Sequence, residues 1–155
     1  MISTDRLDLR LWTDADLTAI AAGTRLPHWA EDFPADGDRV IAGLLADQPQ
    51  WRGEFGHRLL VERTTGLVVG SIGLFWPPAG GRLEIGYGVV PSRQGLGYAT
   101  EATHALTVHA LTAPGVTTVH AGVEPGNPAS VRVLEKAGFA LVDAGAEVHL
   151  YEFGG

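Results

Sequence analysis

The chain has 155 residues, and since a domain usually holds about 100 to 200 residues, this length predicts one domain over residues 1–155 and excludes a two-domain enzyme. Apolar residues make up 45% of the chain, a share typical of globular proteins that excludes global disorder. The net charge is −7, from 11 Lys and Arg against 18 Asp and Glu, which disfavours a nucleic-acid partner bound through its phosphates. The chain has no cysteine, which excludes thiol nucleophiles, thiolate zinc sites and disulfides.

The sequence shows no targeting or membrane signal. The amino-terminal residues carry no basic start followed by an apolar run, and no stretch of about 18 apolar residues occurs anywhere in the chain. We therefore expect a cytoplasmic protein without a membrane partner, present as a monomer or a homodimer.

The amino-terminal third begins with a predicted strand. Residues 7–11 alternate between leucine and charged residues, the period of a strand with one buried face. Thr13 then offers an N-cap hydroxyl for a short helix that should run to about Ala22. The mixed segment 23–53 predicts only one further helix, near residues 38–46.

Three strands are predicted in the middle of the chain. Residues 55–62 and 67–75 are joined by a short polar link that ends in Gly66, as in a hairpin, so we expect them to pair antiparallel. A wider turn leads to a third strand over residues 82–90, which Pro91 ends.

The remaining elements alternate between helices and strands. A helix is predicted over residues 98–111 and a β-branched strand over residues 117–123. Asn127 and Pro128 have the residue types of an N-cap and first helical position, and Gly138 is typical of a left-handed C-terminal cap. Two more strands follow at 139–142 and 147–153. This order predicts an α+β fold with a sheet of mixed direction.

Residues 84–102 lead from a strand through a glycine turn into a helix. Gly95 and Gly97 allow several N–H groups to point at one place, where a helix N-terminus adds a favourable field for an anion such as pyrophosphate. A Walker loop is excluded because Gly-Lys-Ser/Thr is missing, and a dinucleotide fingerprint is excluded because Thr100 replaces its third glycine. The glycines alone are equally compatible with a merely tight connection.

The same segment resembles the acetyl-CoA motif of the GNAT family of N-acetyltransferases. Its opening, Glu-Ile-Gly-Tyr at 84–87, and its ending, Gly-Tyr-Ala-Thr-Glu-Ala at 97–102, are similar to the branch that contains ribosomal-protein N-terminal acetyltransferases. Residues 127–139 resemble the second motif of that branch, and residues 4–10 resemble its opening strand. The three motifs stand in the family's order, whereas residues 23–54 contribute almost nothing to the resemblance.

The resemblance implies a single three-layer α/β/α domain with a mixed, mostly antiparallel sheet of about seven strands. The strand ending near Pro91 is expected to splay from the strand starting near Thr117, and the pantetheine arm of acetyl-CoA is expected to lie in the V between them. Acetyl-CoA is then the co-substrate, and no metal site is expected. The cofactor-binding residues implied by the motifs are Gly88, Val89, Val90, Arg93, Gln94, Gly95, Leu96, Gly97, Tyr98, Ala99 and Asn127.

Acetyl transfer needs a proton acceptor, because free amines have pKa values of about 7.7 to 10.4. The resemblance favours Glu84, although the sequence alone favours an exposed strand-end carboxylate paired with a cation such as Arg82. Many family members protonate the leaving thiolate with a tyrosine where this chain has Leu134, so that role does not carry over. The resembled branch implies Ser130 instead, with Tyr151 or water as alternatives.

The resemblance therefore implies an acetyl-CoA-dependent N-acetyltransferase. Direct transfer through a ternary complex is expected, since no cysteine can carry the acetyl group. The acceptor is a primary amine, either a peptide or protein N-terminus or a small molecule; the alternative is a non-catalytic acyl-CoA-binding sensor or interaction domain. Candidates for lining an acceptor cleft are Trp29 and Trp76, and the acids that could attract a cationic acceptor are Glu31, Asp32, Asp36 and Asp38.

Overall fold

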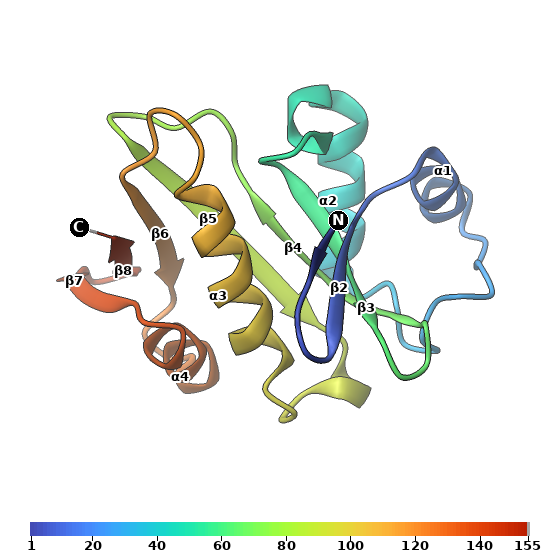
Figure 1. Ribbon diagram of the computed structural model, residues 1–155. Helices are drawn as coiled ribbons and strands as arrows, with labels where there is room; N and C mark the ends of the chain where they lie inside the picture. The colour runs from blue at the N-terminus through green and yellow to red at the C-terminus, as the bar shows by residue number, and fades with distance from the viewer. Residues whose placement is uncertain (155) are drawn as a thin grey trace.

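The structure, a computed structural model, describes residues 1–154 and contains one mixed sheet with helices on both faces (Figure 1). Its strands are β1 (Ile2–Ser3), β2 (Leu7–Leu11), β3 (His57–Glu62), β4 (Val68–Leu74), β5 (Arg82–Val89), β6 (Thr118–Val123), β7 (Ala140–Ala144) and β8 (His149–Gly154). Its helices are α1 (Asp14–Ala22), α2 (Asp36–Asp47), α3 (Tyr98–Ala110) and α4 (Pro128–Lys136), with short 3-10 turns η1 (Pro49–Arg52) and η2 (Pro91–Arg93).

The strands lie in the order β1-β2-β3-β4-β5-β6-β8-β7, and among the strands of residues 1–154 β5 and β6 are the one parallel pair. The α+β class and the mixed, mostly antiparallel sheet are thereby confirmed. The sheet has eight strands within the described residues rather than about seven. The additional strand is β1, which is only two residues long and so carries no periodic pattern in the sequence.

The predicted splay lies between β5 and β6. Their pairing joins residues 82–84 to residues 118–120 and ends there, although β5 continues to Val89. On its other edge β5 stays paired with β4 as far as Val89. The two neighbouring strands therefore separate beyond Glu84, which confirms the V-shaped opening expected from the resemblance.

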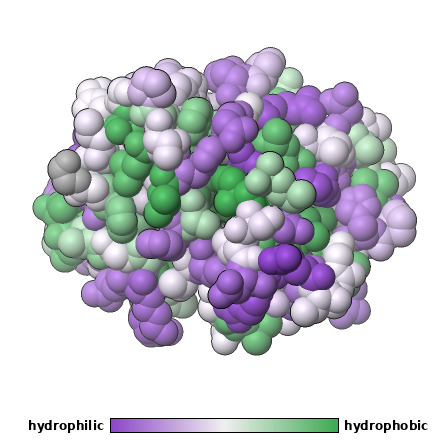
Figure 2. Space-filling view, in the orientation of Figure 1, coloured by the Kyte–Doolittle hydropathy of each residue, from purple (hydrophilic) through white to green (hydrophobic). Residues whose placement is uncertain are grey.

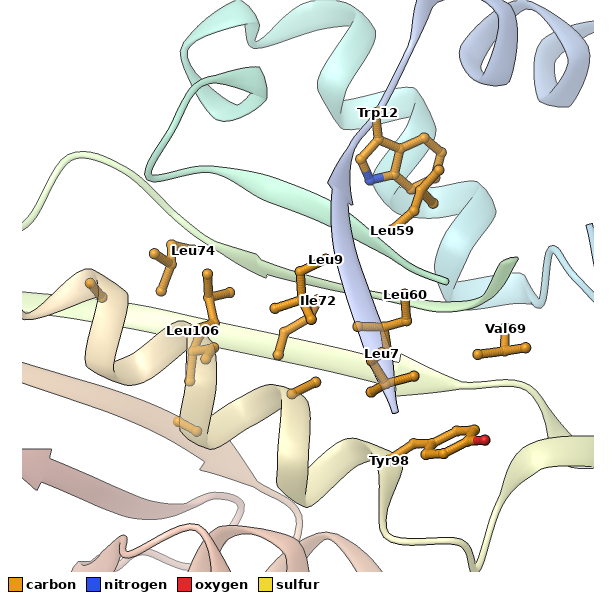
Figure 3. Close-up of a cluster of buried hydrophobic side chains, with 14 of the residues drawn as sticks. Leu7, Leu9, Trp12, Leu59, Leu60, Val69, Ile72, Leu74, Tyr98 and Leu106 are labelled. Carbon is orange, nitrogen blue, oxygen red and sulfur yellow. The ribbon is translucent and has the colours of Figure 1, made fainter. Parts of the chain in front are cut away.

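Hydrophobic residues fill both faces of the sheet. Figure 3 shows Leu9, Ile72 and Leu106 between the strands and α3, whereas Trp12 and Leu59 lie on the opposite face, toward α2. None of these five side chains is more than 4% exposed. Burying a large apolar side chain contributes about 1.5–3 kcal/mol, so the two layers of contacts hold α2 and α3 on opposite sides of the sheet.

Helix boundaries follow local capping. Thr13 accepts a hydrogen bond from the N–H of Asp16, whose carboxylate accepts one from the N–H of Thr13, as in a capping box. Asn127 accepts from the N–H of Ser130 at 3.2 Å, and Gly138 has a φ of 99° after the last turn of α4. The predicted caps are confirmed.

The surface mixes polar and apolar residues. On the face seen in Figure 2, hydrophobic residues form separate groups among hydrophilic ones. Exposed apolar side chains include Leu141, Val142 and Val148 around β7 and the β7–β8 turn. Among the described residues, no helix is both long and apolar enough to cross a bilayer.

Gly70 lets β4 approach β5 closely opposite Val89, beside the open end of the V. A methyl group on Gly70 would lie 2.2 Å from the carbonyl oxygen of Gly88 and 3.1 Å from Cα of Val89. Both contacts are backbone atoms, which cannot rotate away. A side chain at this position must therefore displace β5 itself.

Replacing Gly70 with alanine should lower the free energy of unfolding by about 2–3 kcal/mol, because overpacking forces the backbone to shift. The matched control is Gly43→Ala in α2, where an added methyl has no neighbour within 4 Å and alanine should stabilise the helix by about 0.5–1 kcal/mol. Urea unfolding of both variants measures the difference, and a Gly70→Ala midpoint equal to that of the wild type would contradict the packing argument.

Candidate active site

Two pockets lie against β5, one on each face of the sheet. The first, which we call the turn pocket, has a volume of about 510 Å³ and lies between β5, the glycine turn and α4. The second, which we call the α2 pocket, has a volume of about 430 Å³ and lies between α2 and strands β3, β4 and β5. Both are lined by Tyr87, Gly88 and Val89, so the two pockets meet along one short segment of β5.

The turn pocket collects most of the predicted cofactor residues. Two of the predicted residues, Val90 and Leu96, do not line the turn pocket. Val90 is fully buried and donates its N–H to the carbonyl of Val69, and Leu96 is 48% exposed. The predicted residues that do line it are Gly88, Val89, Arg93, Gln94, Gly95, Gly97, Tyr98, Ala99 and Asn127, together with Ser130.

A buried carboxylate holds the turn from within. Glu62, at the end of β3, accepts hydrogen bonds from the hydroxyl of Tyr98 at 2.7 Å and from Nε of Arg93 at 3.1 Å. Thr65 donates to its other oxygen at 2.7 Å. Burial raises the pKa of Glu62, but these donors outweigh burial and leave the pKa below its ordinary value.

Further side chains tie the turn to distant parts of the chain. Arg6, just before β2, donates to the carbonyl of Leu96 at 2.7 Å and to Glu101 at 2.9 Å. Asp32 accepts from the N–H of Ser92 at 2.7 Å and from its hydroxyl at 2.8 Å. The opening strand and the mixed segment thus both fix the glycine turn.

A pair of hydroxyl groups spans the opening between β5 and α4. The hydroxyl of Tyr87 lies 2.6 Å from Oγ of Ser130 and also donates to the carbonyl of Ser130 at 3.3 Å. Burial raises the pKa of Tyr87 more than its hydrogen bond to Ser130 lowers it, so the phenol stays protonated at neutral pH. Sequence reasoning assigned no role to Tyr87, although it stands within the motif that carries the resemblance.

Two cations of α4 were also missed from sequence. Arg132 and Lys136 line the turn pocket and stand four residues apart, on one face of the helix. Their four-residue spacing, in the helix predicted to begin at Pro128, was the available signal. These side chains supply positive charge to the pocket of a protein whose net charge is −7.

The predicted proton acceptor, Glu84, lies outside both pockets. It is exposed, and it stands beside His120 at the last parallel pair of β5 and β6. Its suggested partner, Arg82, instead forms an ion pair with Glu152. Tyr151, the alternative proton donor, is 5% exposed in β8 and lines neither pocket.

The α2 pocket holds a small polar group on mainly apolar walls. Oδ1 of Asp38 accepts a hydrogen bond from the hydroxyl of Ser71 at 2.5 Å, and Oδ2 accepts from the N–H of Ala35 at 2.9 Å. Burial raises the pKa of Asp38 despite these donors. His57 also lines the pocket, and burial lowers its pKa to about 4, so its ring is neutral at pH 7.

Most candidates for lining an acceptor cleft lie elsewhere. Trp29 is 4% exposed in the core, and neither it nor Trp76 lines the α2 pocket. Of the four acids only Asp38 lines this pocket. Asp32 binds the turn, and Asp36 is exposed and forms an ion pair with Arg39. Over residues 1–154, no group of three or more His, Asp or Glu side chains is placed to hold a metal ion.

The sheet parts after one short parallel pairing of β5 and β6, and a glycine turn and the N-terminus of α3 lie beside the gap. Residues 6–140 match the acetyltransferase (GNAT) domain family, and the chain therefore belongs to that family. This confirms the resemblance, and the protein is an N-acetyltransferase.

Known relatives agree with this assignment. The chain is 29% identical over 145 residues to the uncharacterized N-acetyltransferase YoaA of Bacillus subtilis, which covers 90% of this chain and 82% of YoaA. An acetyltransferase from Agrobacterium tumefaciens superposes with a TM-score of 0.72 at 26% identity, covering 99% and 94% of the two chains. Mycobacterium smegmatis RimJ, solved in complex with CoA-disulfide, shares the fold with a TM-score of 0.67 at 24% identity, over 96% and 81%.

Replacing Glu62 with glutamine should destabilise the protein by about 2 kcal/mol at pH 7, because hydrogen bonds to a buried charged group are lost. Since its folded pKa is depressed, Glu62 stabilises the fold above the ordinary value of 4.5, and this contribution is lost as the pH falls through the folded pKa. Urea unfolding at a series of pH values should show the gap between wild type and variant closing in acid.

The matched control for this comparison is Glu135→Gln on the exposed side of α4. Its stability should stay within about 0.5 kcal/mol of the wild type, as for most surface changes. A Glu62→Gln variant that behaves like this control at every pH would show that Glu62 does not anchor the turn.

Proposed function

We propose that the protein transfers an acetyl group from acetyl-CoA directly to a primary amine while both substrates are bound. The observation that supports this proposal is the meeting of the two pockets at Tyr87, Gly88 and Val89 from opposite faces of the sheet. A thioester reaching β5 through the turn pocket is then open to attack from the α2 pocket. Direct transfer also agrees with a chain that has no cysteine to carry an acetyl group.

The residues of the turn pocket fit coenzyme A. Gly95 and Gly97 have φ values of 79° and 84°, so the turn adopts a backbone shape that other residues rarely take, just before α3 begins. N–H groups over 93–99 would hold the pyrophosphate, while Arg132 and Lys136 of α4 would pair with phosphate groups. The backbone of β5 at Gly88 and Val89 would bind the pantetheine arm, and Asn127, already the N-cap of α4, would add a side-chain contact.

Ser130 is proposed as the proton donor to the departing thiolate. Its hydroxyl lines the turn pocket and is hydrogen-bonded to Tyr87, which can replace the proton that Ser130 gives up. An N–H group near Gly88 or Val89 is proposed to stabilise the oxyanion. Glu84 stays a prediction for the proton acceptor, and its exposure outside both pockets gives it little geometric support.

Release of the coenzyme A thiol in the presence of a panel of amines tests the proposed activity. The panel should include small primary amines, spermidine and a peptide with a free N-terminus, and binding of acetyl-CoA should be measured in parallel by calorimetry. We expect thiol release that depends on at least one amine. Tight binding of acetyl-CoA without turnover on any amine would instead support the sensor or interaction domain.

Ser130→Ala and Tyr87→Phe should each lower kcat by about 10²-fold, the lower end of what positioned acid catalysis contributes. Because the two hydroxyls act as one pair, the double variant should lose little more than either single variant. Acetyl-CoA affinity should change far less than kcat. If Tyr151→Phe lowers kcat and Ser130→Ala does not, the proton donor is Tyr151.

A further inference from the structure

The α2 pocket contains a buried polar group that the proposed transfer has not yet used. Asp38 is 4% exposed, Ser71 5% and His57 2%, and all three line the pocket. Nε2 of His57 is buried without a hydrogen-bond partner in the described structure. A buried polar atom without a hydrogen-bond partner is costly unless a ligand supplies one.

The register of the sheet places this group beside the segment where the pockets meet. Ser71 of β4 pairs with Gly88 of β5, so their side-chain positions face the same side of the sheet, toward Asp38 of α2. A methyl group built on Gly88 would have no neighbour within 4 Å. The glycine therefore leaves the way open between Ser71 and a thioester at β5.

We propose that Asp38, acting through Ser71, accepts the proton of the amine, and that the α2 pocket takes a primary amine carried on a compact, uncharged, apolar group. This inference rests on the proposed function and assigns its acceptor site. Asp38 replaces the sequence-based prediction of Glu84, which lines neither pocket.

The proton path balances in atoms and charge. The amine nitrogen forms a bond to the thioester carbonyl carbon, and its proton passes to Oγ of Ser71 as the hydroxyl proton of Ser71 passes to Oδ1 of Asp38. The carbon–sulfur bond then breaks, and the thiolate takes a proton from the Ser130–Tyr87 pair. Asp38 returns its proton to solvent and the hydroxyl pair regains one from solvent, so an amide and a free thiol are the only products.

The surroundings of Asp38 suit a proton acceptor. The titratable or charged groups around it are His57 on β3 and Arg39 on α2, whereas Tyr87 of β5 directs its hydroxyl to Ser130 on the opposite face of the sheet. His57 is neutral at pH 7, because burial lowers its pKa, and Tyr87 stays protonated, because burial raises its pKa. Burial also raises the pKa of Asp38, which makes its carboxylate a stronger base than an exposed one.

The walls of the pocket determine the kind of amine. Val40 and Ile41 of α2 and Phe75, just after β4, supply its large apolar contacts. Asp38 is the one carboxylate among the lining residues, and both of its oxygens already accept hydrogen bonds. A second positive charge on the acceptor would have to leave water without a partner, which is unfavourable.

The test compares Asp38→Asn with Asp36→Asn, two changes of the same kind in the first turn of α2. Asparagine keeps an oxygen that can accept from the N–H of Ala35, so α2 retains its local contact, and Asp36 is fully exposed. We expect Asp38→Asn to lower kcat by about 10²-fold or more, with acetyl-CoA binding unchanged, and Asp36→Asn to match the wild type. Ser71→Ala should lower kcat in the same direction.

The pH dependence separates proton transfer from a purely structural role. The ratio of wild-type to Asp38→Asn kcat should be largest at alkaline pH and should shrink in acid, because Asp38 of the wild type becomes protonated below its raised pKa. A ratio that does not change with pH, or full activity in Asp38→Asn, overturns the assignment. If Glu84→Gln loses turnover while Asp38→Asn keeps it, the proton acceptor is Glu84 and the assignment of Asp38 is overturned.

The acceptor class is tested with butylamine, benzylamine, putrescine, spermidine and a short peptide. We expect kcat/KM for butylamine or benzylamine to exceed that for putrescine or spermidine by about 10-fold or more. Preference for a polyamine or the peptide overturns the assigned class. If the protein binds acetyl-CoA but releases no thiol with any amine, both the proposed function and this inference are overturned. If thiol release occurs and the Asp38→Asn variant retains it in full, the inference alone is overturned.

Discussion

Parallel pairing between β5 and β6 ends at Glu84 and His120, and the segment of β5 that lines both pockets lies beyond this end. Because β5 remains paired with β4 up to Val89, the strand stays in the sheet while its other edge separates from β6. Backbone groups on a separated edge need partners. Gln94 provides one by donating to the carbonyl of Val89, and a bound substrate can provide others.

The distribution of carboxylates explains how an acidic protein can bind an anion. Glu62, Glu101 and Asp32 each accept hydrogen bonds from the turn or from side chains that hold it. These carboxylates therefore fix the loop, while Arg132 and Lys136 face the space where phosphates would lie. A net charge of −7 describes the whole chain and not the surface that meets the ligand.

Local patterns in the sequence predicted most of the fold. Periodicity located the strands, and side chains such as Thr13 and Asn127 marked where helices begin, because these features depend on neighbours within a few residues. The motif resemblance then indicated most residues of the turn pocket. The separation of β5 from β6 was predicted only from the family resemblance, because no local sequence pattern indicates where two distant strands separate.

Contacts between distant residues could not be predicted in the same way. Tyr87 and Ser130 are 43 residues apart, and Asp38 and Ser71 are 33 apart, so each pair depends on how helices pack against the sheet. Asp38 lies in a segment without a recognisable motif, and nothing in the sequence distinguished it from the neighbouring acids Glu31, Asp32 and Asp36. Glu84 shows the opposite case, because its position in the motif was clear but the structure leaves its side chain exposed.

The contacts of Arg6, Glu62 and Asp32 fix the conformation of the glycine turn without any contribution from a ligand. Ordering a flexible loop upon association weakens affinity, because conformational entropy is lost at that step. In this protein the conformational entropy of the turn is lost when the chain folds, and burial of the hydrophobic core offsets that loss during folding. A coenzyme bound as proposed would therefore meet a preorganised turn, and a change that loosens β2 or the end of β3 would weaken its binding without altering any residue in contact with it.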